Sequence, residues 1–158
     1  MTEKRLSLRA QTEKLRASLK AAGLRSTLPR VQLLRIFREK KGHYSADELH
    51  SALGERGVLL PRASVYNAVN DFRKRGLIRE VDIGSGKAVF EDAEQAAHHH
   101  FICRSCGQIQ DIPCEVVHSP CIDHSINYAR IEEATIIFRG LCRECRYLER
   151  GSNSKEAI

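Results

Sequence analysis

Four of the six cysteines form two Cys-x-x-Cys pairs, Cys103 with Cys106 and Cys142 with Cys145. Four thiolates in two such pairs complete the tetrahedral shell of a structural Zn(II) and leave no position open for a substrate. With 35 residues between the pairs, such a metal would tie together the two ends of a whole domain. The spacing therefore predicts a structural zinc site, with disulfides or free thiols as the alternative.

Three consecutive histidines, His98, His99 and His100, stand just before the first cysteine pair. Side chains alternate between the two faces of an extended strand, so His98 and His100 would share one face and His99 would lie on the other. Two imidazoles on one face, next to a cysteine knuckle, indicate two metal sites placed side by side.

A second set of metal ligands results when side chains from elsewhere in the chain are added to His98 and His100. The added residues are His43, Glu91 and Asp111. Nitrogen and oxygen donors of this kind suit Fe(II), Mn(II) or Zn(II). A lone histidine such as His43 is also compatible with an ordinary surface loop. Because the ligands come from both halves of the chain, metal occupancy would depend on the relative position of the halves.

Charge is divided unevenly along the sequence. Residues 1–80 contain 18 Lys and Arg against 8 Asp and Glu, whereas residues 81–158 contain 8 against 12, so the net charges are +10 and −4. A basic half suits nucleic-acid phosphates, and an acidic half with histidines and cysteines suits a cation. A merely solvated basic surface is the alternative.

The basic half has the order of elements of a winged helix-turn-helix. Apolar spacing predicts four helices, the third of them capped by Ser45 and Glu48, and an alternating strand with a short returning strand follows. The predicted ranges are 8–22, 29–40, 46–53 and 61–75 for the helices and 77–83 and 87–90 for the strands.

The fourth predicted helix has an outer face suited to reading DNA. Its inner stripe is apolar, whereas Tyr66 and Asn67 lie on the opposite side among cations. Asn can read an adenine edge and Tyr can contact a thymine methyl, while Arg25 and Lys74 suit phosphate or the minor groove. We therefore expect double-stranded operator DNA as a partner.

The second half is expected to be a small domain of strands and helices. Strands are predicted at 98–102, 108–112 and 128–138, with a partly helical segment at 114–126. The fold class is then α/β (α+β). The predicted parts are a winged-helix domain over residues 1–91, a hinge over 92–97, a metal-binding domain over 98–150 and a flexible tail over 151–158.

Taken together, the motifs resemble the ferric uptake regulator family of metal-dependent repressors over about residues 15–147. The matching segments are Gly23–Arg25, Thr27–Arg30, Ser45–Leu49 after His43, Ala63–Asn67, Gly76–Ile78, His98–Gly107 and the closing Cys142–Cys145. The resemblance implies a homodimer with a winged-helix DNA-binding domain and a dimerisation domain. It also implies a regulatory metal site at His43, Glu91, His98, His100 and Asp111, and a structural zinc at Cys103, Cys106, Cys142 and Cys145.

The resemblance extends to the peroxide-sensing members, in which bound Fe(II) reacts with hydrogen peroxide and a histidine ligand is oxidised. Asp111 and Val65–Asn67 favour this subgroup, whereas Glu91 favours the iron sensors. On the peroxide interpretation, His43 and His98 are the expected oxidation targets. The alternative is a repressor of iron or zinc homeostasis controlled by metal occupancy alone. His99 and His118 match ligands of a further metal site in the family.

Other classes of function lack supporting motifs. A zinc deaminase needs a His-x-Glu with Pro-Cys-x-x-Cys pattern, which the chain does not have, so we do not expect an enzyme. Cys114 and Cys121 suit buried thiols, with a redox role as the alternative. A zinc-stabilised interaction module without DNA binding is the third possibility. The first twenty residues contain no apolar signal-like run and no segment suits a membrane span, so the expected location is cytoplasmic.

Overall fold

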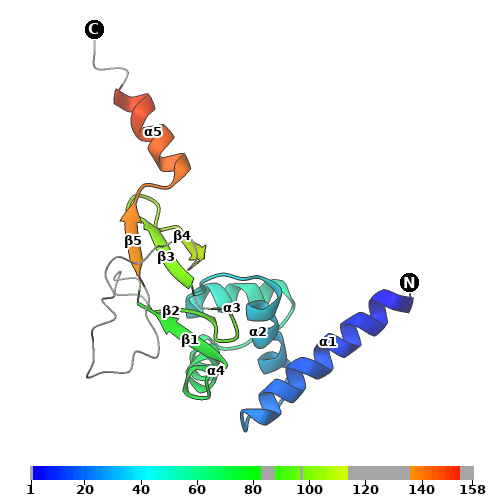
Figure 1. Ribbon diagram of the computed structural model, residues 1–158. Coiled ribbons are helices and arrows are strands. Elements are labelled where there is room, and N and C mark those ends of the chain that lie inside the picture. Colours follow the sequence, from blue (N-terminus) through cyan, green and yellow to red (C-terminus); the bar gives the residue numbers. More distant parts are fainter. Residues whose placement is uncertain (1, 83–87, 97, 114–135, 154–158) are drawn as a thin grey trace, which may run out of the picture. The chain divides into compact units, whose positions relative to one another are not determined.

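The computed structural model describes residues 2–82, 88–96, 98–113 and 136–153 (Figure 1). Contacts divide the chain into two units, Met1–Gln95 and Ala96–Ile158. Helices and strands occur in both, so the predicted mixed α+β class is confirmed. Among the described residues, no helix has the length and apolar character needed to cross a membrane.

The described part of the first unit consists of four helices followed by a two-stranded hairpin. In chain order these are α1 (Thr2–Ala21), α2 (Leu28–Glu39), α3 (Ala46–Glu55), α4 (Arg62–Lys74), β1 (Ile78–Val81) and β2 (Val89–Asp92). The strands pair antiparallel, with Ile78 opposite Asp92 and Val81 opposite Val89. Helices followed by this hairpin form the predicted winged helix-turn-helix. The residues that join the two strands, 83–87, lie outside the described residues.

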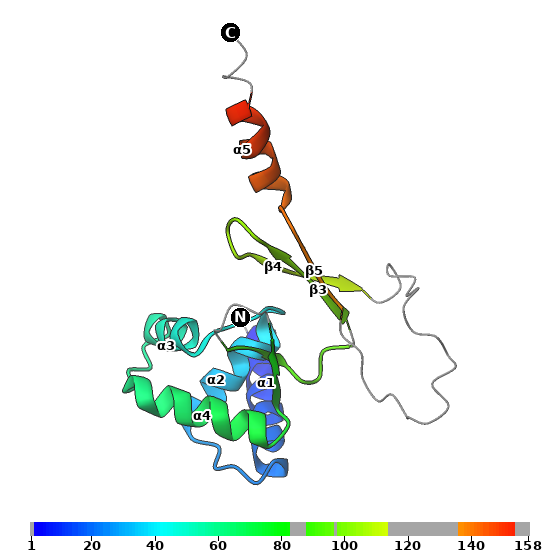
Figure 2. The same cartoon turned by 90° about the vertical axis from the view of Figure 1, so that its left-hand side faces the viewer.

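The core of this unit is formed by the apolar stripes that the helix periodicity predicted. Figure 2 shows α4 passing in front of α1 and α2. From α4, Val65, Val69 and Phe72 are fully buried, and they meet Leu34 of α2 and Leu49 of α3 in one cluster. Burying large aliphatic and aromatic side chains stabilises a fold by about 1.5–3 kcal/mol each, so this cluster fixes the orientation of α4.

The start of α3 and the end of α4 agree with the helix-capping residues in the sequence, whereas the start of α1 differs from the prediction. The Ser45 side chain accepts a bond from the Glu48 backbone N–H, and the Glu48 carboxylate accepts one from Ser45, so the capping box that begins α3 is confirmed. Gly76 follows α4 with a φ of +70°, which favours glycine. By contrast, α1 begins at Thr2 rather than at residue 8. Its first turns carry too few apolar residues for periodicity to detect them.

In the second unit, the described residues form a three-stranded sheet and one helix. β3 (His98–Cys103) lies in the middle, antiparallel to β4 (Ile109–Pro113) and parallel to β5 (Ile137–Gly140), and α5 (Arg143–Asn153) follows. The sequence predicted β3 and β4, but it missed α5, whose last residues belong to the predicted tail. The described end of the predicted 128–138 strand, Ile137–Phe138, lies in β5. Residues 114–135 and 154–158 lie outside the described residues, including the predicted helical segment.

Candidate metal centres and DNA-binding surface

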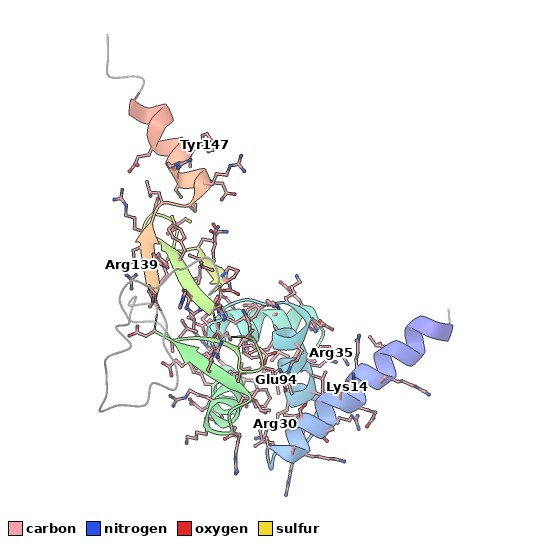
Figure 3. All side chains as sticks on the ribbon, in the orientation of Figure 1. Lys14, Arg30, Arg35, Glu94, Arg139 and Tyr147 are labelled. Atoms are coloured by element: carbon pink, nitrogen blue, oxygen red, sulfur yellow. The ribbon has the colours of Figure 1, made fainter. Side chains whose placement is uncertain are left out.

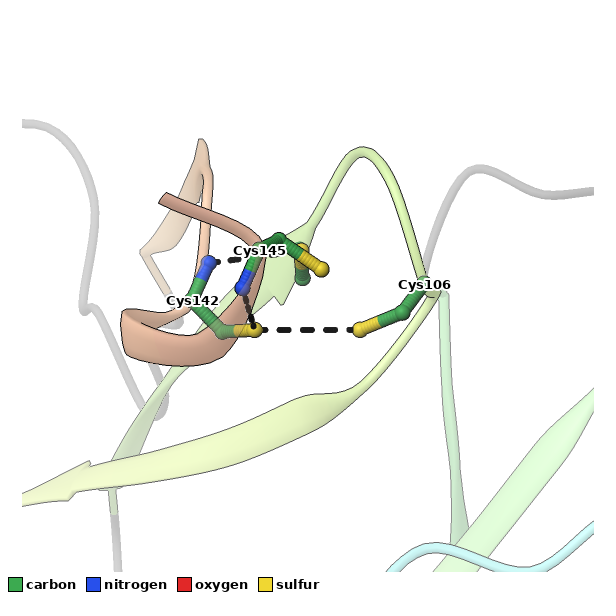
Figure 4. A group of neighbouring side chains, drawn as sticks. Cys106, Cys142 and Cys145 are labelled. Carbon is green, nitrogen blue, oxygen red and sulfur yellow. Dashed lines mark hydrogen bonds between the residues drawn. The ribbon is translucent and has the colours of Figure 1, made fainter. Parts of the chain in front are cut away.

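The two cysteine pairs meet at one end of β3. The four Sγ atoms of Cys103, Cys106, Cys142 and Cys145 all lie within 4.8 Å of one another. The Cys106 and Cys142 sulfurs are 3.9 Å apart, and Figure 4 shows these two side chains directed toward each other. Tetrahedral zinc with Zn–S bonds of about 2.3 Å places its sulfurs about 3.8 Å apart, whereas a disulfide needs about 2.05 Å. All four cysteines are free thiols, so the cluster fits a zinc ion.

Backbone geometry holds each pair in place. Cys103 is the last residue of β3, and Gly107, with a φ of +74°, donates its N–H to the Cys103 carbonyl at 2.9 Å to close the first knuckle. The second knuckle begins α5, where the Cys145 N–H donates to Cys142 Sγ at 3.5 Å. Cys142 therefore takes the place that an N-cap side chain usually occupies. The Cys-x-x-Cys spacing is compatible with a helix that begins directly after Cys142, but the sequence analysis did not predict this helix.

Protonation differs within the cluster. The Cys142 N–H, which donates to Cys103 Sγ at 3.3 Å, is the main cause that lowers the pKa of the Cys103 thiol to about 6. At Cys145, a bond with the Ser105 hydroxyl lowers the pKa, but the neighbouring Cys142 thiol and burial outweigh it and raise the pKa to about 12. Within the cluster, the proton is thus held less tightly at Cys103 than at Cys145.

Histidines and a carboxylate meet at the other end of β3. His100 is the direct cross-strand partner of Asp111 on β4, and His98 lies diagonally next to it on the same face. The His98 and His100 rings have centroids 4.7 Å apart, and His98 Nε2 lies 3.7 Å from Asp111 Oδ1. Ligand atoms of the three residues lie within 4.8 Å of one another. Two imidazoles and a carboxylate in this arrangement can hold a divalent transition metal.

Bonds to the backbone set the ring orientation of the neighbouring histidines. His98 Nδ1 lies 2.8 Å from the Ala96 carbonyl, an acceptor, so Nδ1 donates to it and Nε2 is the nitrogen that faces Asp111. A backbone bond of this kind is typical of metal-binding histidines. His99 is different because its Nδ1 accepts from the Ile136 N–H at 3.2 Å. Its neutral ring then carries the proton on Nε2, which leaves no lone pair for a metal in this arrangement.

In the first unit, His43 and Glu91 lie together. His43 Nε2 is 2.9 Å from one oxygen of Glu91, and Arg79 Nε donates to the other. Arg79 and Glu91 are direct partners across the β1–β2 hairpin. The sequence analysis named His43 and Glu91 but missed Arg79. Arg79 could have been identified only from the register of the hairpin, which places it opposite Glu91 and depends on the length of the turn.

The predicted DNA contacts all lie on exposed parts of the first unit. Tyr66, 42% exposed, and Asn67 project from the outer face of α4, Lys74 ends that helix, and Arg25 lies in the connection between α1 and α2. A helix that buries one face and exposes polar and aromatic side chains on the other can present these side chains to base edges in a groove.

Two residues that the sequence analysis did not single out contact Tyr66. Asp47, in the first turn of α3, accepts from Arg62 Nε at 2.6 Å and from the Tyr66 hydroxyl at 3.2 Å. These bonds, led by that from Arg62, hold the pKa of the Asp47 carboxyl below its usual value. Their members lie on two helices, so no local pattern in the sequence links them.

A separate cavity of about 670 Å³ lies between α1 and α2. Lys14 and Arg35 extend from the two helices toward it, and Glu94 lies nearby (Figure 3). Arg35 already donates to Thr12 at 2.6 Å, and Arg38 is paired with Asp92 at 2.6 Å. The arginines therefore serve the packing of the unit. Cys114, His118 and Cys121, by contrast, lie outside the described residues.

Comparisons with known proteins agree on one family. A model described as the ferric uptake regulator family matches residues 21–128. The transcriptional regulator FurA of Mycobacterium bovis is 35% identical over 133 residues, which are 80% of this chain and 86% of that protein. The ferric uptake regulator of Vibrio cholerae superposes with a TM-score of 0.65 at 28% identity, covering 80% of this chain and 98% of that one. The ferric uptake regulator of Francisella tularensis with iron superposes with a TM-score of 0.64 at 27% identity, covering 76% and 92%.

Proposed function

This chain belongs to the ferric uptake regulator family of metal-dependent transcription regulators, and we propose that it is a repressor that binds double-stranded operator DNA when metal is bound. The main support is the grouping of His98, His100 and Asp111 on one face of β3 and β4. The exposed face of α4, with Tyr66 and Asn67, supplies a surface for base contacts. A homodimer would present two such helices to the two half-sites of an operator.

The metals follow from the donor chemistry. Four thiolates suit Zn(II) as a structural ion, and imidazole with carboxylate suits Fe(II) or Mn(II), with Zn(II) as a further occupant. We include His43 and Glu91 in the regulatory set, as the donors that the first unit would contribute. The structure of the Francisella tularensis relative with iron supports Fe(II) as a candidate.

Operator binding measured with and without metal tests this proposal. A duplex selected by the protein from a random library serves as the operator, and fluorescence anisotropy gives the affinity under anaerobic conditions. We expect Fe(II) or Mn(II) to tighten binding at least tenfold over chelator-treated protein that retains its cysteine-bound zinc. Equal affinity in both states would show that the histidine and aspartate group does not regulate DNA binding.

We further propose that the Fe(II) form senses peroxide. Fe(II), when bound, supplies electrons to hydrogen peroxide, and an imidazole beside it is the group exposed to oxidation. His98 supports this because its Nδ1 bond to Ala96 keeps Nε2 directed to the same place as Asp111. Loss of a nitrogen donor would weaken metal binding and with it the affinity for operator.

Mass spectrometry separates this proposal from control by metal occupancy alone. After a stoichiometric dose of peroxide, we expect one oxygen atom added to His43 or His98 in the Fe(II) protein, with loss of operator binding. The Mn(II) protein is the matched control and should stay unmodified. If the Fe(II) protein keeps both its mass and its affinity, the second candidate, an iron or zinc homeostasis repressor, is the better description.

A further inference from the structure

We infer that Asp47 is a specificity-determining residue of the proposed DNA surface, where it holds Arg62 back from phosphate and fixes the position of Tyr66. Arg62 is the first residue of α4 and Tyr66 lies one turn later, while Asp47 reaches them from α3. The inference rests on the proposed DNA-binding function. It adds a residue that makes no base contact of its own.

The contacts form a fork between two helices. Both Asp47 oxygens are engaged, since Arg62 Nε donates to Oδ1 at 2.6 Å and Arg62 Nη2 pairs with Oδ2. The Tyr66 hydroxyl also donates to Oδ1, at 3.2 Å, and the Arg62 guanidinium lies 6.0 Å from the centre of the Tyr66 ring. A two-point guanidinium–carboxylate pair has a defined geometry, so it holds Asp47 Oδ1 in place as the acceptor of the Tyr66 hydroxyl.

The location of this fork argues against a purely structural role. The side chains of Arg62 and Asp47 are 63% and 51% exposed, and exposed ion pairs contribute little to folding. The pair with Asp47 occupies a guanidinium that would otherwise be available to a DNA phosphate. On this inference Asp47 lowers the general affinity for DNA and raises the discrimination between sequences.

Removal of Asp47 should separate these two effects. In Asp47→Ala, Arg62 is released to bind phosphate, so affinity for a random duplex should rise severalfold and the salt slope should steepen by about one. Tyr66 loses its anchor, so the ratio of operator to random-duplex affinity should fall about tenfold, the value of one good base contact. In Tyr66→Phe, which loses only the hydroxyl, the ratio should fall similarly, and Asp47→Ala should lower it little further in that background.

The matched control uses another ion pair on the same helix. Arg73 of α4 pairs with Glu80 at 2.9 Å, and both side chains are partly exposed. Glu80→Gln also removes one negative charge and frees one arginine, so it should raise both affinities together and leave their ratio unchanged. Circular dichroism and zinc content verify that every variant is folded.

The outcomes are distinct. An unchanged ratio in folded Asp47→Ala, or equal behaviour of Asp47→Ala and Glu80→Gln, overturns the role of Asp47. If the wild-type protein selects no sequence from the random library, the proposed DNA-binding function itself fails, whatever the variants do.

Discussion

The two ends of β3 carry two groups of metal-binding side chains that differ in almost every physical respect. At the Cys103 end, four sulfurs gather between a glycine-closed turn and the first turn of α5, and backbone N–H groups donate to two of them. At the His98 end, imidazoles and a carboxylate face one another across a pair of strands. The same strand thus supports a soft, four-donor site and a harder nitrogen and oxygen site.

The number and type of ligands at each end of β3 indicate which of the two sites can exchange its metal. Four thiolates complete the shell of zinc, so no position is left for exchange or chemistry. Three donors from β3 and β4 leave positions to be filled, and nitrogen and oxygen ligands accept several divalent metals, so the metal that is bound depends on geometry and on availability. We expect the first site to be permanent and the second to follow the supply of metal.

The largest effect should come from breaking the sulfur cluster. Cys142→Ser removes both a ligand and the sulfur that accepts from the Cys145 N–H at the start of α5. Since structural zinc binding is worth about 10–16 kcal/mol of apparent free energy in small domains, we expect loss of zinc and a collapse in thermal stability. Metal analysis and calorimetry measure both. Cys114→Ser, outside the two pairs, is the control and should keep its zinc; equal loss in both variants would contradict the assignment.

Removing a metal ligand at the His98 end of β3 should leave the fold intact. Asp111→Asn removes the charge that faces His98 Nε2 at 3.7 Å while it preserves shape. We expect affinity for Fe(II) or Mn(II) to fall by about 10–100-fold, with zinc content and melting temperature nearly unchanged. Titration under anaerobic conditions gives the affinity. Gln110→Asn, at the neighbouring β4 position whose side chain alternates to the other face, is the control, and an equal loss there would mean that the face of β4 does not matter.

Within the cysteine cluster, Cys103 and Cys145 should differ in the protons that they release when zinc binds. A thiol must lose its proton to bind zinc, and Cys145, with its pKa raised to about 12, is protonated at pH 7, whereas Cys103, with its pKa lowered to about 6, is not. Zinc binding at pH 7 should therefore release the proton of Cys145 but almost none from Cys103. Below pH 6, Cys103 also releases one, so zinc affinity should fall more steeply with acidification. Calorimetry in buffers of different ionisation enthalpy counts the protons, and a count that does not increase below pH 6 would contradict the assignment.

The helices, most of the strands and the types of metal ligand could be predicted from the sequence, because they depend on local patterns. The periodicity of α4 identified Val65, Val69 and Phe72 as its inner face, and all three are buried. The Ser45 and Glu48 spacing specified the start of α3. The alternation of side chains along a strand predicted that His98 and His100 share one face of β3. In the structure Asp111, on the neighbouring strand β4, lies opposite His100.

Contacts between distant segments were not accessible, because they depend on register and on helix packing. Arg79 reaches Glu91 only because the hairpin pairs them, and one residue more or less in the turn would place another side chain there. Asp47 and Arg62 belong to different helices, so their meeting depends on how α3 packs on α4. The helix α5 was missed since Cys142 was interpreted as a ligand alone and not also as its cap.

The smallest expected effect tests whether a third metal site exists on the opposite face of β3. His99 accepts the Ile136 N–H at Nδ1, so its ring joins the segment before β5 to the sheet. If that is its whole role, His99→Ala costs about 1–3 kcal/mol of stability, because the Ile136 N–H loses its acceptor, and changes neither zinc content nor Fe(II) affinity. His99→Asn, which can still accept the bond through its side-chain oxygen, should recover part of the loss. A drop in total bound metal in both variants would instead assign His99 a ligand role, and the bond to Ile136 would then belong to the metal-free state only.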